Sequence, residues 1–236
     1  MFLAAYLKLY VDCLSRAAAG IAKNAWTLVL PMGLFAAVAL LAVPLSALGP
    51  LSGMFLRLAM YFAFSSYLYF AAGIVANQKV GLDDLKKSFL AYFWSIMGLL
   101  FVVWIAEIVL GAVFGQNPNK GVILLGLDLL AFVVLNAAPE IIYTKGTRGG
   151  MDTISRSVKF VQENWIEWFV PMLLVGAAAY GVWSNLWRLP GAVTLVLALV
   201  GGAIFHLVMV FRGHLFEALD SSTHRQRMFK YGRRDA

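Results

Sequence analysis

The sequence predicts an all-α polytopic membrane protein with six transmembrane helices arranged as three parallel pseudo-repeats. Three observations predict it: the composition, a segment that recurs 140 residues along the chain, and the distribution of Lys and Arg. Of the 236 residues, 61% are hydrophobic and 13% are charged, and the mean hydropathy is +0.80. Ordinary soluble domains are far less apolar, so this composition is typical of a membrane protein.

A short charged helix that leads into a long apolar run occurs three times. In each copy an acid lies four residues before a base, and the three pairs are Asp12/Arg16, Asp83/Lys87 and Asp152/Arg156. Such an i,i+4 pair contributes only about 0.2–0.5 kcal/mol to a helix. A contribution of this size does not explain why the pair recurs, so the recurrence indicates a repeated unit.

The first and third copies align without gaps. Residues 12–39 and 152–179 are identical at nine of 28 positions, among them Asn24/Asn164 and Pro31/Pro171. Each Asn immediately precedes an apolar run, where it is expected to cap the incoming helix or to break the preceding one. Each Pro lies inside the run and is expected to kink its helix.

Six apolar runs are long enough to cross a bilayer. A spanning helix needs about 20 mostly apolar residues, because its backbone must be hydrogen-bonded within the segment. The expected spans are about 25–48, 52–76, 91–115, 120–144, 165–187 and 191–213. The sequence predicts one transmembrane domain over 1–236. Its parts are pseudo-repeats of about 1–76, 77–145 and 146–213, each an interfacial amphipathic helix followed by a helical hairpin, and a basic tail at 214–236.

Basic residues predict the orientation. Sixteen of the 19 Lys and Arg fall on the side that carries both termini, and Lys120 and Arg188 fall on the other side. Cytoplasmic segments are enriched in positive charge, so both termini are expected in the cytoplasm of a multi-pass plasma (inner) membrane protein. The first apolar run, from Ala25, exceeds a signal-peptide core, and no removable leader is expected.

Three of the ionisable residues inside expected spans are the first candidates for an intramembrane site: Arg57, Glu107 and Asp128. Counting helical rise places all three within about 8–12 Å of the far interface. Intramembrane charge is costly and marks a functional hypothesis, here a proton or cation site in which one carboxylate pairs with Arg57. The alternative is a charge cluster that only fixes helix packing.

A second polar layer is expected at the cytoplasmic ends of spans four and six. It contains Glu140, His206 and Arg212. A proton relay is conceivable there, whereas a helix-helix hydrogen bond is the simpler role for His206. No Cys, His and acidic spacing predicts a metal site, and no catalytic or nucleotide-binding motif occurs. No cofactor and no enzymatic activity are therefore expected.

The tail from Thr223 to Arg234 combines basic and aromatic residues. Because it is tethered beside a bilayer, contact with anionic headgroups is favoured over nucleic acid. Docking of the tail to a cytoplasmic protein is also open.

In the repeated pattern from Asp12 to Pro31 and from Asp152 to Pro171, the chain resembles bacterial six-span inner-membrane proteins of the YciC type. It also resembles the membrane region of some glycerophosphodiester phosphodiesterases. The resemblance implies the six-span layout and carries over no catalytic residue.

The expected role is a scaffold or accessory subunit of a membrane complex, with a protein partner or a second copy. A small-solute or ion transporter that uses Arg57, Glu107 and Asp128 is the alternative. An integral-membrane enzyme that depends on Glu140 or His206 is the third class.

Overall fold

The computed structural model describes residues 2–186 and 191–232, and every regular element in these ranges is a helix. The α-helices are α1 Phe2–Lys23, α2 Leu30–Leu45, α3 Ser52–Val75, α4 Leu85–Ala91, α5 Phe93–Val113, α6 Lys120–Val134, α7 Ala138–Lys145, α8 Gly150–Leu186, α9 Gly191–Asp220 and α10 His224–Gly232. Three 3-10 turns join them: η1 Ala25–Val29, η2 Ser46–Leu51 and η3 Leu82–Asp84. The predicted all-α class is confirmed.

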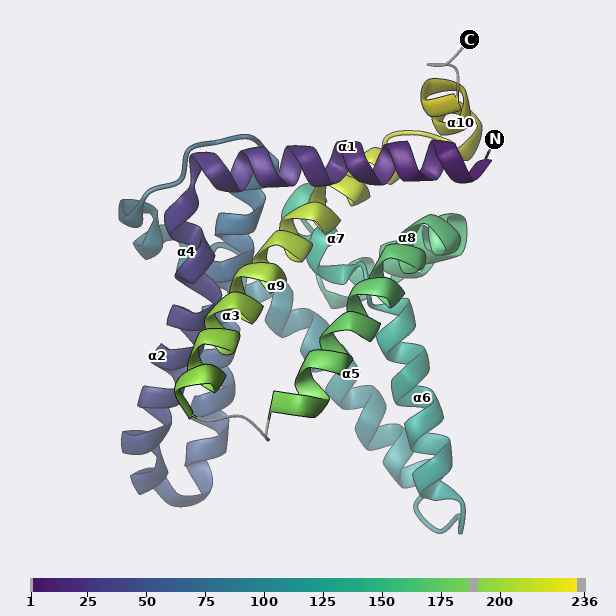
Figure 1. The fold of residues 1–236 in the computed structure, drawn as a ribbon. Helices are drawn as coiled ribbons and strands as arrows, with labels where there is room; N and C mark the ends of the chain where they lie inside the picture. Colours follow the sequence, from purple (N-terminus) through teal and green to yellow (C-terminus); the bar gives the residue numbers. More distant parts are fainter. Residues whose placement is uncertain (1, 187–190, 233–236) are drawn as a thin grey trace.

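Four segments of the described chain are long and apolar enough to cross a membrane. They are Ala25–Val75, Leu82–Val113, Lys120–Lys145 and Val196–Asp220. The first contains both α2 and α3, which pack side by side (Figure 1). Gly49 reverses the chain between them with φ +58°, a value that glycine adopts at little steric cost.

The helices form two groups beneath a crossbar. In Figure 1, α1 lies across one end of the molecule, and the long helices run away from it. One group contains α2, α3 and α9, and the other contains α5 and α6. The second half of α8 runs between them, and its end at Leu186 precedes the start of α9 at Gly191 by five positions. The groups diverge with distance from α1, so their distal ends lie far apart in this view.

Burial follows this divergence. In the most apolar 18-residue stretches of the first three segments, only 6%, 6% and 11% of residues are buried. The value is 28% for Val196–Asp220, which includes the end of α9 beneath α1. A helix in a closed bundle buries a whole stripe of its surface, so the distal halves are not packed together as a bundle.

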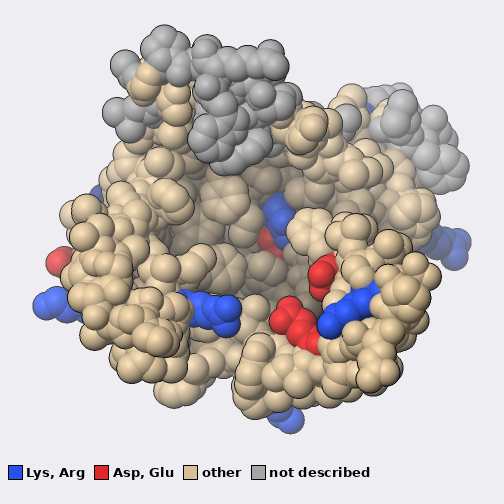
Figure 2. Space-filling model, turned by 90° about the horizontal axis from the view of Figure 1, so that it is seen from below, with Lys and Arg blue, Asp and Glu red and all other residues tan. Residues whose placement is uncertain are grey.

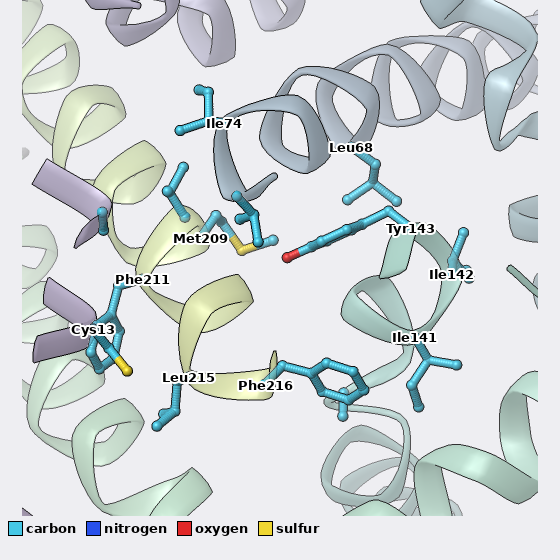
Figure 3. Close-up of a cluster of buried hydrophobic side chains, with 14 of the residues drawn as sticks. Cys13, Leu68, Ile74, Ile141, Ile142, Tyr143, Met209, Phe211, Leu215 and Phe216 are labelled. Carbon is cyan, nitrogen blue, oxygen red and sulfur yellow. The ribbon is translucent and has the colours of Figure 1, made fainter. Parts of the chain in front are cut away.

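The core lies next to α1, where α3, α7 and α9 meet. Figure 3 shows its side chains converging from these helices, among them Leu68, Ile74, Ile141, Met209 and Phe216. Along α1, a stripe at four-residue spacing is buried, and it consists of Ala5, Leu9, Cys13, Ala17 and Ile21. This spacing places one face of α1 on α9 and α10.

Each of the three charged helices ends at a backbone break before its long apolar helix. The residues at the breaks are Asn24 (φ −129°, ψ 41°), Tyr92 (φ −123°, ψ 5°) and Asn164 (φ −131°, ψ 19°). The prediction that Pro31 and Pro171 kink their helices alike is wrong. Pro31 is in the first turn of α2, where its missing N–H costs nothing, whereas Pro171 lies inside α8, whose non-helical residue is Asn164.

Candidate functional site: polar junctions beneath α1

The predicted layer of Arg57, Glu107 and Asp128 is not an ion-paired cluster. All three residues are exposed, and the described residues include no ion pair that joins Arg57 to either carboxylate. Their helices α3, α5 and α6 belong to diverging groups. Figure 2, seen from the end opposite α1, shows a central hollow with acidic and basic groups in and around it. The pairing expected for Arg57 is therefore wrong.

The predicted inner layer contains a buried ion pair. Arg212 on α9 donates from Nε to Glu140 Oε1 at 2.8 Å and from Nη2 to Oε2 at 3.0 Å. Glu140 on α7 has no solvent exposure, and the Arg212 side chain is 13% exposed. Two parallel charge-assisted bonds fix the relative orientation of the two groups, so this pair ties α7 to α9.

Two further residues complete the surroundings of Arg212. Its guanidinium carbon lies 5.0 Å from the ring centroid of Trp168, and Nη2 also donates to the carbonyl of Asn136. Trp168 in turn donates from Nε1 to Asn136 Oδ1 at 2.9 Å. Asn136 lies in the gap between α6 and α7, where Pro139 provides no N–H for the carbonyl of Leu135. The N–H of Ala138 binds that carbonyl instead at 3.0 Å, so the helix is interrupted where Asn136 is needed.

His206, the third member of the predicted inner layer, binds other partners. Its Nε2 lies 3.0 Å from Thr27 Oγ1, and its Nδ1 lies 3.3 Å from the Tyr67 hydroxyl. The Thr27 hydroxyl already donates its proton to the carbonyl of Asn24 at 2.7 Å. Nε2 is then the donor to Thr27, and Nδ1 accepts from Tyr67. His206 thus joins α9 to η1 and α3 through neutral hydrogen bonds.

The first junction is organised by Asn24, which is 2% exposed. Its Nδ2 donates to the carbonyl of Gly20 at 3.0 Å and to the carbonyl of Gln78 at 3.1 Å. Its Oδ1 accepts the N–H of Val80 at 2.9 Å. One side chain therefore breaks the helix after α1 and holds the chain that returns from α3.

The third junction is organised by Asn164 in an equivalent way. Its Nδ2 donates to the carbonyl of Phe160 at 3.1 Å, which is again four residues earlier. Its Oδ1, however, accepts from Nη2 of Arg227 at 2.9 Å. The returning segment here is the C-terminal tail instead of a loop.

Arg227 is buried among oxygen atoms. It is 3% exposed and donates from Nη1 to the carbonyls of Leu219 (2.9 Å) and Ser222, and from Nη2 to Glu167 Oε1 at 3.2 Å. Glu167 also binds His224 Nδ1 at 2.9 Å. Arg227 therefore uses both Nη groups inside the protein, and contact of the tail with anionic headgroups stays a prediction.

A serine organises the middle junction. The hydroxyl of Ser65 on α3 accepts the N–H of Tyr92 at 3.0 Å and donates to the carbonyl of Ser88 at 3.1 Å. These two groups would bond to each other in a continuous helix, because they are four residues apart. The inserted hydroxyl separates α4 from α5 at Tyr92, so a side chain from the preceding hairpin makes this break.

The three acid-base pairs of the repeat differ in the structure. Arg156 donates from Nε to Asp152 at 2.9 Å as expected. Asp12 instead accepts from the Tyr231 hydroxyl at 3.2 Å, and Arg16 faces Glu217 at 3.9 Å. Lys87 is 4.0 Å from Asp84, not paired with Asp83. The expected i,i+4 pair therefore forms only in the third unit among the described residues.

Burial dominates the ionisation of groups on the α1 face. It raises the pKa of the Cys13 thiol from 9.0 to about 12, with Asp12 adding to the effect. It likewise raises the pKa of Tyr10, beside Glu167, to about 12 and that of Tyr231, beside Asp12, to about 12. At Asp152, a hydrogen bond from the backbone N–H of Arg148 and the bond from Arg156 lower the pKa. Cys13 and the two tyrosines are therefore neutral at physiological pH.

Within residues 2–186 and 191–232, no group of three His, Cys, Asp or Glu side chains is arranged to hold a metal ion. No family model, curated protein or solved structure matches this chain.

Sequence reasoning missed seven side chains that form these junctions: Thr27, Ser65, Tyr67, Asn136, Glu167, Trp168 and Arg227. Thr27 and Glu167 occupy equivalent positions at the offset of 140, but they are different residues, so the alignment gave no signal for them. The others are positioned by contacts between helices, which sequence spacing does not reveal.

Proposed function

We propose that this chain is a non-enzymatic membrane scaffold or accessory subunit, whose six spans form three similar units with both termini in the cytoplasm. The polar junctions beneath α1 hold the units together at one end. The distal halves then remain available to a membrane-embedded partner or a second copy.

The observation that carries the proposal is the contrast in burial along the long helices. Large apolar side chains are exposed on the distal halves of both groups, for example Leu40 (73%), Val43 (72%) and Val122 (73%). In a membrane, helix association depends on close packing, because lipid tails are as apolar as the side chains. The polar junctions join the helices at the α1 end, and the helices diverge from there. Their distal halves therefore offer surfaces between them for another helix.

Site-specific photo-crosslinking in cells tests this role. A photoreactive amino acid at Leu40, Val43 or Val122 is expected to give an adduct with one discrete protein, which peptide mass spectrometry identifies. Met151, which is 66% exposed at the start of α8, is the matched control position outside the distal halves. Adducts with lipid alone at all three distal positions would contradict the scaffold role.

Transport is the second candidate function. It is supported by the acidic and basic groups in and around the central hollow of Figure 2, together with the exposed, unpaired state of Arg57, Glu107 and Asp128. Ion flux into proteoliposomes that falls in Glu107→Gln and Asp128→Asn would favour it. Flux that is the same for wild type, for both variants and for protein-free vesicles would exclude transport and leave only the scaffold role.

A further inference from the structure

A cavity of about 700 Å³ lies beside the third junction, where the end of α7, the first half of α8, the end of α9 and the start of α10 meet. Its size is within the range of small-ligand pockets, about 300–1,000 Å³. Arg227 and Asn164, the residues that fasten the tail, form part of its wall. The cavity is therefore a product of tail docking.

Bases outnumber acids on the wall of this cavity. Four permanently basic side chains line it, from three different elements: Lys145, Arg156, Lys159 and Arg227. Two acids line it, Glu163 and Asp220. Lys145 is committed to Asp220, with 2.5 Å between Nζ and Oδ2. Glu163 is then the remaining acid on the wall, and the acids that pair with Arg156 and Arg227, Asp152 and Glu167, lie outside the lining.

The other three bases hold donors without a partner among the described residues. Arg156 uses only Nε, in its bond to Asp152, and both of its Nη groups are unengaged. Lys159 Nζ is 4.0 Å from Glu163, beyond hydrogen-bond distance. The Nε of Arg227 is buried and has no hydrogen-bond partner. A buried charged donor without a partner is costly, so an acceptor from outside the chain would relieve it.

The spacing on α8 suits an oxyanion. Arg156 and Lys159 are three residues apart, so they lie on the same face of the helix. A guanidinium presents two parallel N–H groups to a phosphate, and an ammonium adds a point charge. Both residues precede the apolar part of α8 by one or two turns, which is headgroup depth if α8 enters the membrane after Asn164.

We propose that this cavity binds the phosphate group of an anionic phospholipid, held by Arg156, Lys159 and Arg227. The lipid source rests on the membrane placement given under the proposed function, whereas the phosphate chemistry does not. The site would couple the presence of anionic lipid to the docked state of the tail, because Arg227 belongs to both.

Lipid titration of the purified full chain tests the proposal. Delipidated protein in dodecyl maltoside is titrated with short-chain phosphatidylglycerol, and occupancy is followed by native mass spectrometry. Phosphatidylcholine is the second arm and inorganic phosphate, as a competitor, is the third. We expect phosphatidylglycerol to bind with one-to-one stoichiometry, to outcompete phosphatidylcholine and to be displaced by phosphate.

The matched variants are Arg156→Gln with Lys159→Gln, and Lys79→Gln with Lys86→Gln. The second pair removes the same charge from exposed positions outside the cavity. The cavity pair is expected to weaken phosphatidylglycerol binding at least about tenfold, and the control pair less than about twofold. If the cavity pair fails to fold, Lys159→Gln alone is used, because its side chain is 77% exposed, and about threefold weakening is expected.

Equal affinity of the cavity variant and wild type would overturn the proposal, as would equal binding of the two lipids without competition by phosphate. Binding of inorganic phosphate that depends on Arg156 and Lys159, without any lipid binding, would support a phosphate site that is filled from water instead of from the membrane. Loss of the crosslinked partner with lipid binding intact would count only against the scaffold role.

Discussion

The junctions at Asn24 and Asn164 have the same backbone and different partners. Their φ values are −129° and −131°, and each side-chain amide donates to the carbonyl four residues earlier. The side-chain oxygen Oδ1 of Asn24 accepts the backbone N–H of Val80, whereas Oδ1 of Asn164 accepts an N–H of the Arg227 guanidinium. The asparagine therefore specifies the break, and the segment that returns to it is interchangeable.

The difference lies in charge. Three positions after each asparagine, Thr27 makes a neutral bond with His206, and Glu167 makes an ionic bond with Arg227. A buried ion pair adds little when complete, because both charges lose their water. Removal of one partner, however, strands the other charge. Removal of a charged partner at the third junction should therefore cost more than removal of the matched neutral partner, Thr27, at the first.

The largest expected effect is that of Glu167→Gln, which keeps the shape of the side chain and removes its charge. Arg227 is 3% exposed and would lose its counter-ion, at a cost of about 3–5 kcal/mol. Thr27→Val, the matched change at the first junction, removes two neutral hydrogen bonds, to the carbonyl of Asn24 and from His206, at a cost of about 2 kcal/mol. Free energies of unfolding from SDS titration in mixed micelles measure both.

A double-mutant cycle provides the control for Glu167→Gln. Arg227→Met combined with Glu167→Gln leaves no unpaired charge, so the double variant should be more stable than the sum of the two single losses predicts. Strict additivity, or a loss at Thr27 as large as the loss at Glu167, would contradict the ionic account.

Much of the fold could be predicted because helix boundaries depend on local sequence. The alternation of charged helix and apolar run located α1, the start of α8 and both breaking asparagines. Four segments able to span a membrane occur in the part of the chain that the structure describes, and the finer count of six spans stays a prediction. The kink predicted at Pro31 is absent, because the 3-10 turn Ala25–Val29 moves the start of α2 to Leu30 and leaves Pro31 in its first turn.

The polar contacts were harder to predict. The sequence gives the depth of a residue in the membrane, but not which neighbouring helix its side chain faces. Arg57, Glu107 and Asp128 have similar expected depths, yet their helices diverge and no pair forms. The segregation of Arg227 from the other tail bases also depends on a tertiary contact, that with Asn164. The composition of the tail and its tethering beside the bilayer favoured lipid contact and left docking to a protein open, without separating Arg227 from its neighbours.

The next largest effect concerns the asparagines themselves. Asn24→Ala leaves the N–H of Val80 and the carbonyl of Gln78 without their partner, and we expect a loss of about 2–3 kcal/mol. Asn164→Ala removes one of several acceptors from Arg227, so a loss of about 1–2 kcal/mol is expected. The same SDS titration measures the pair, with Asn119→Ala, outside both junctions, as the control. A larger loss at Asn164 would reverse the assignment of roles.

A smaller effect is expected at the residue whose carbonyl accepts the asparagine amide. Gly20 occupies this position in the first unit, and a methyl group there would lie 2.9 Å from Cγ2 of Ile74. Gly20→Ala should cost about 1 kcal/mol, the lower end of overpacking, because the Ile74 side chain can give way. The corresponding residue, Phe160, packs 4.5 Å from Phe216 between ring centroids. Ile74→Val should reduce the cost of Gly20→Ala, and an unchanged cost would exclude Ile74 as its cause.

The smallest effect is expected at Cys13, which aligns with Thr153, a residue buried to the same extent. Burial raises the pKa of the Cys13 thiol to about 12, so the reactive thiolate is a minor species at pH 8. Labelling of native protein by a maleimide should therefore be negligible at pH 8 and should rise about tenfold per pH unit up to pH 10. SDS-denatured protein is the positive control. Rapid labelling of the native protein at pH 8 would mean that α1 leaves its site beneath the tail, and the stability differences between the junctions would then have to be measured with α1 crosslinked in place.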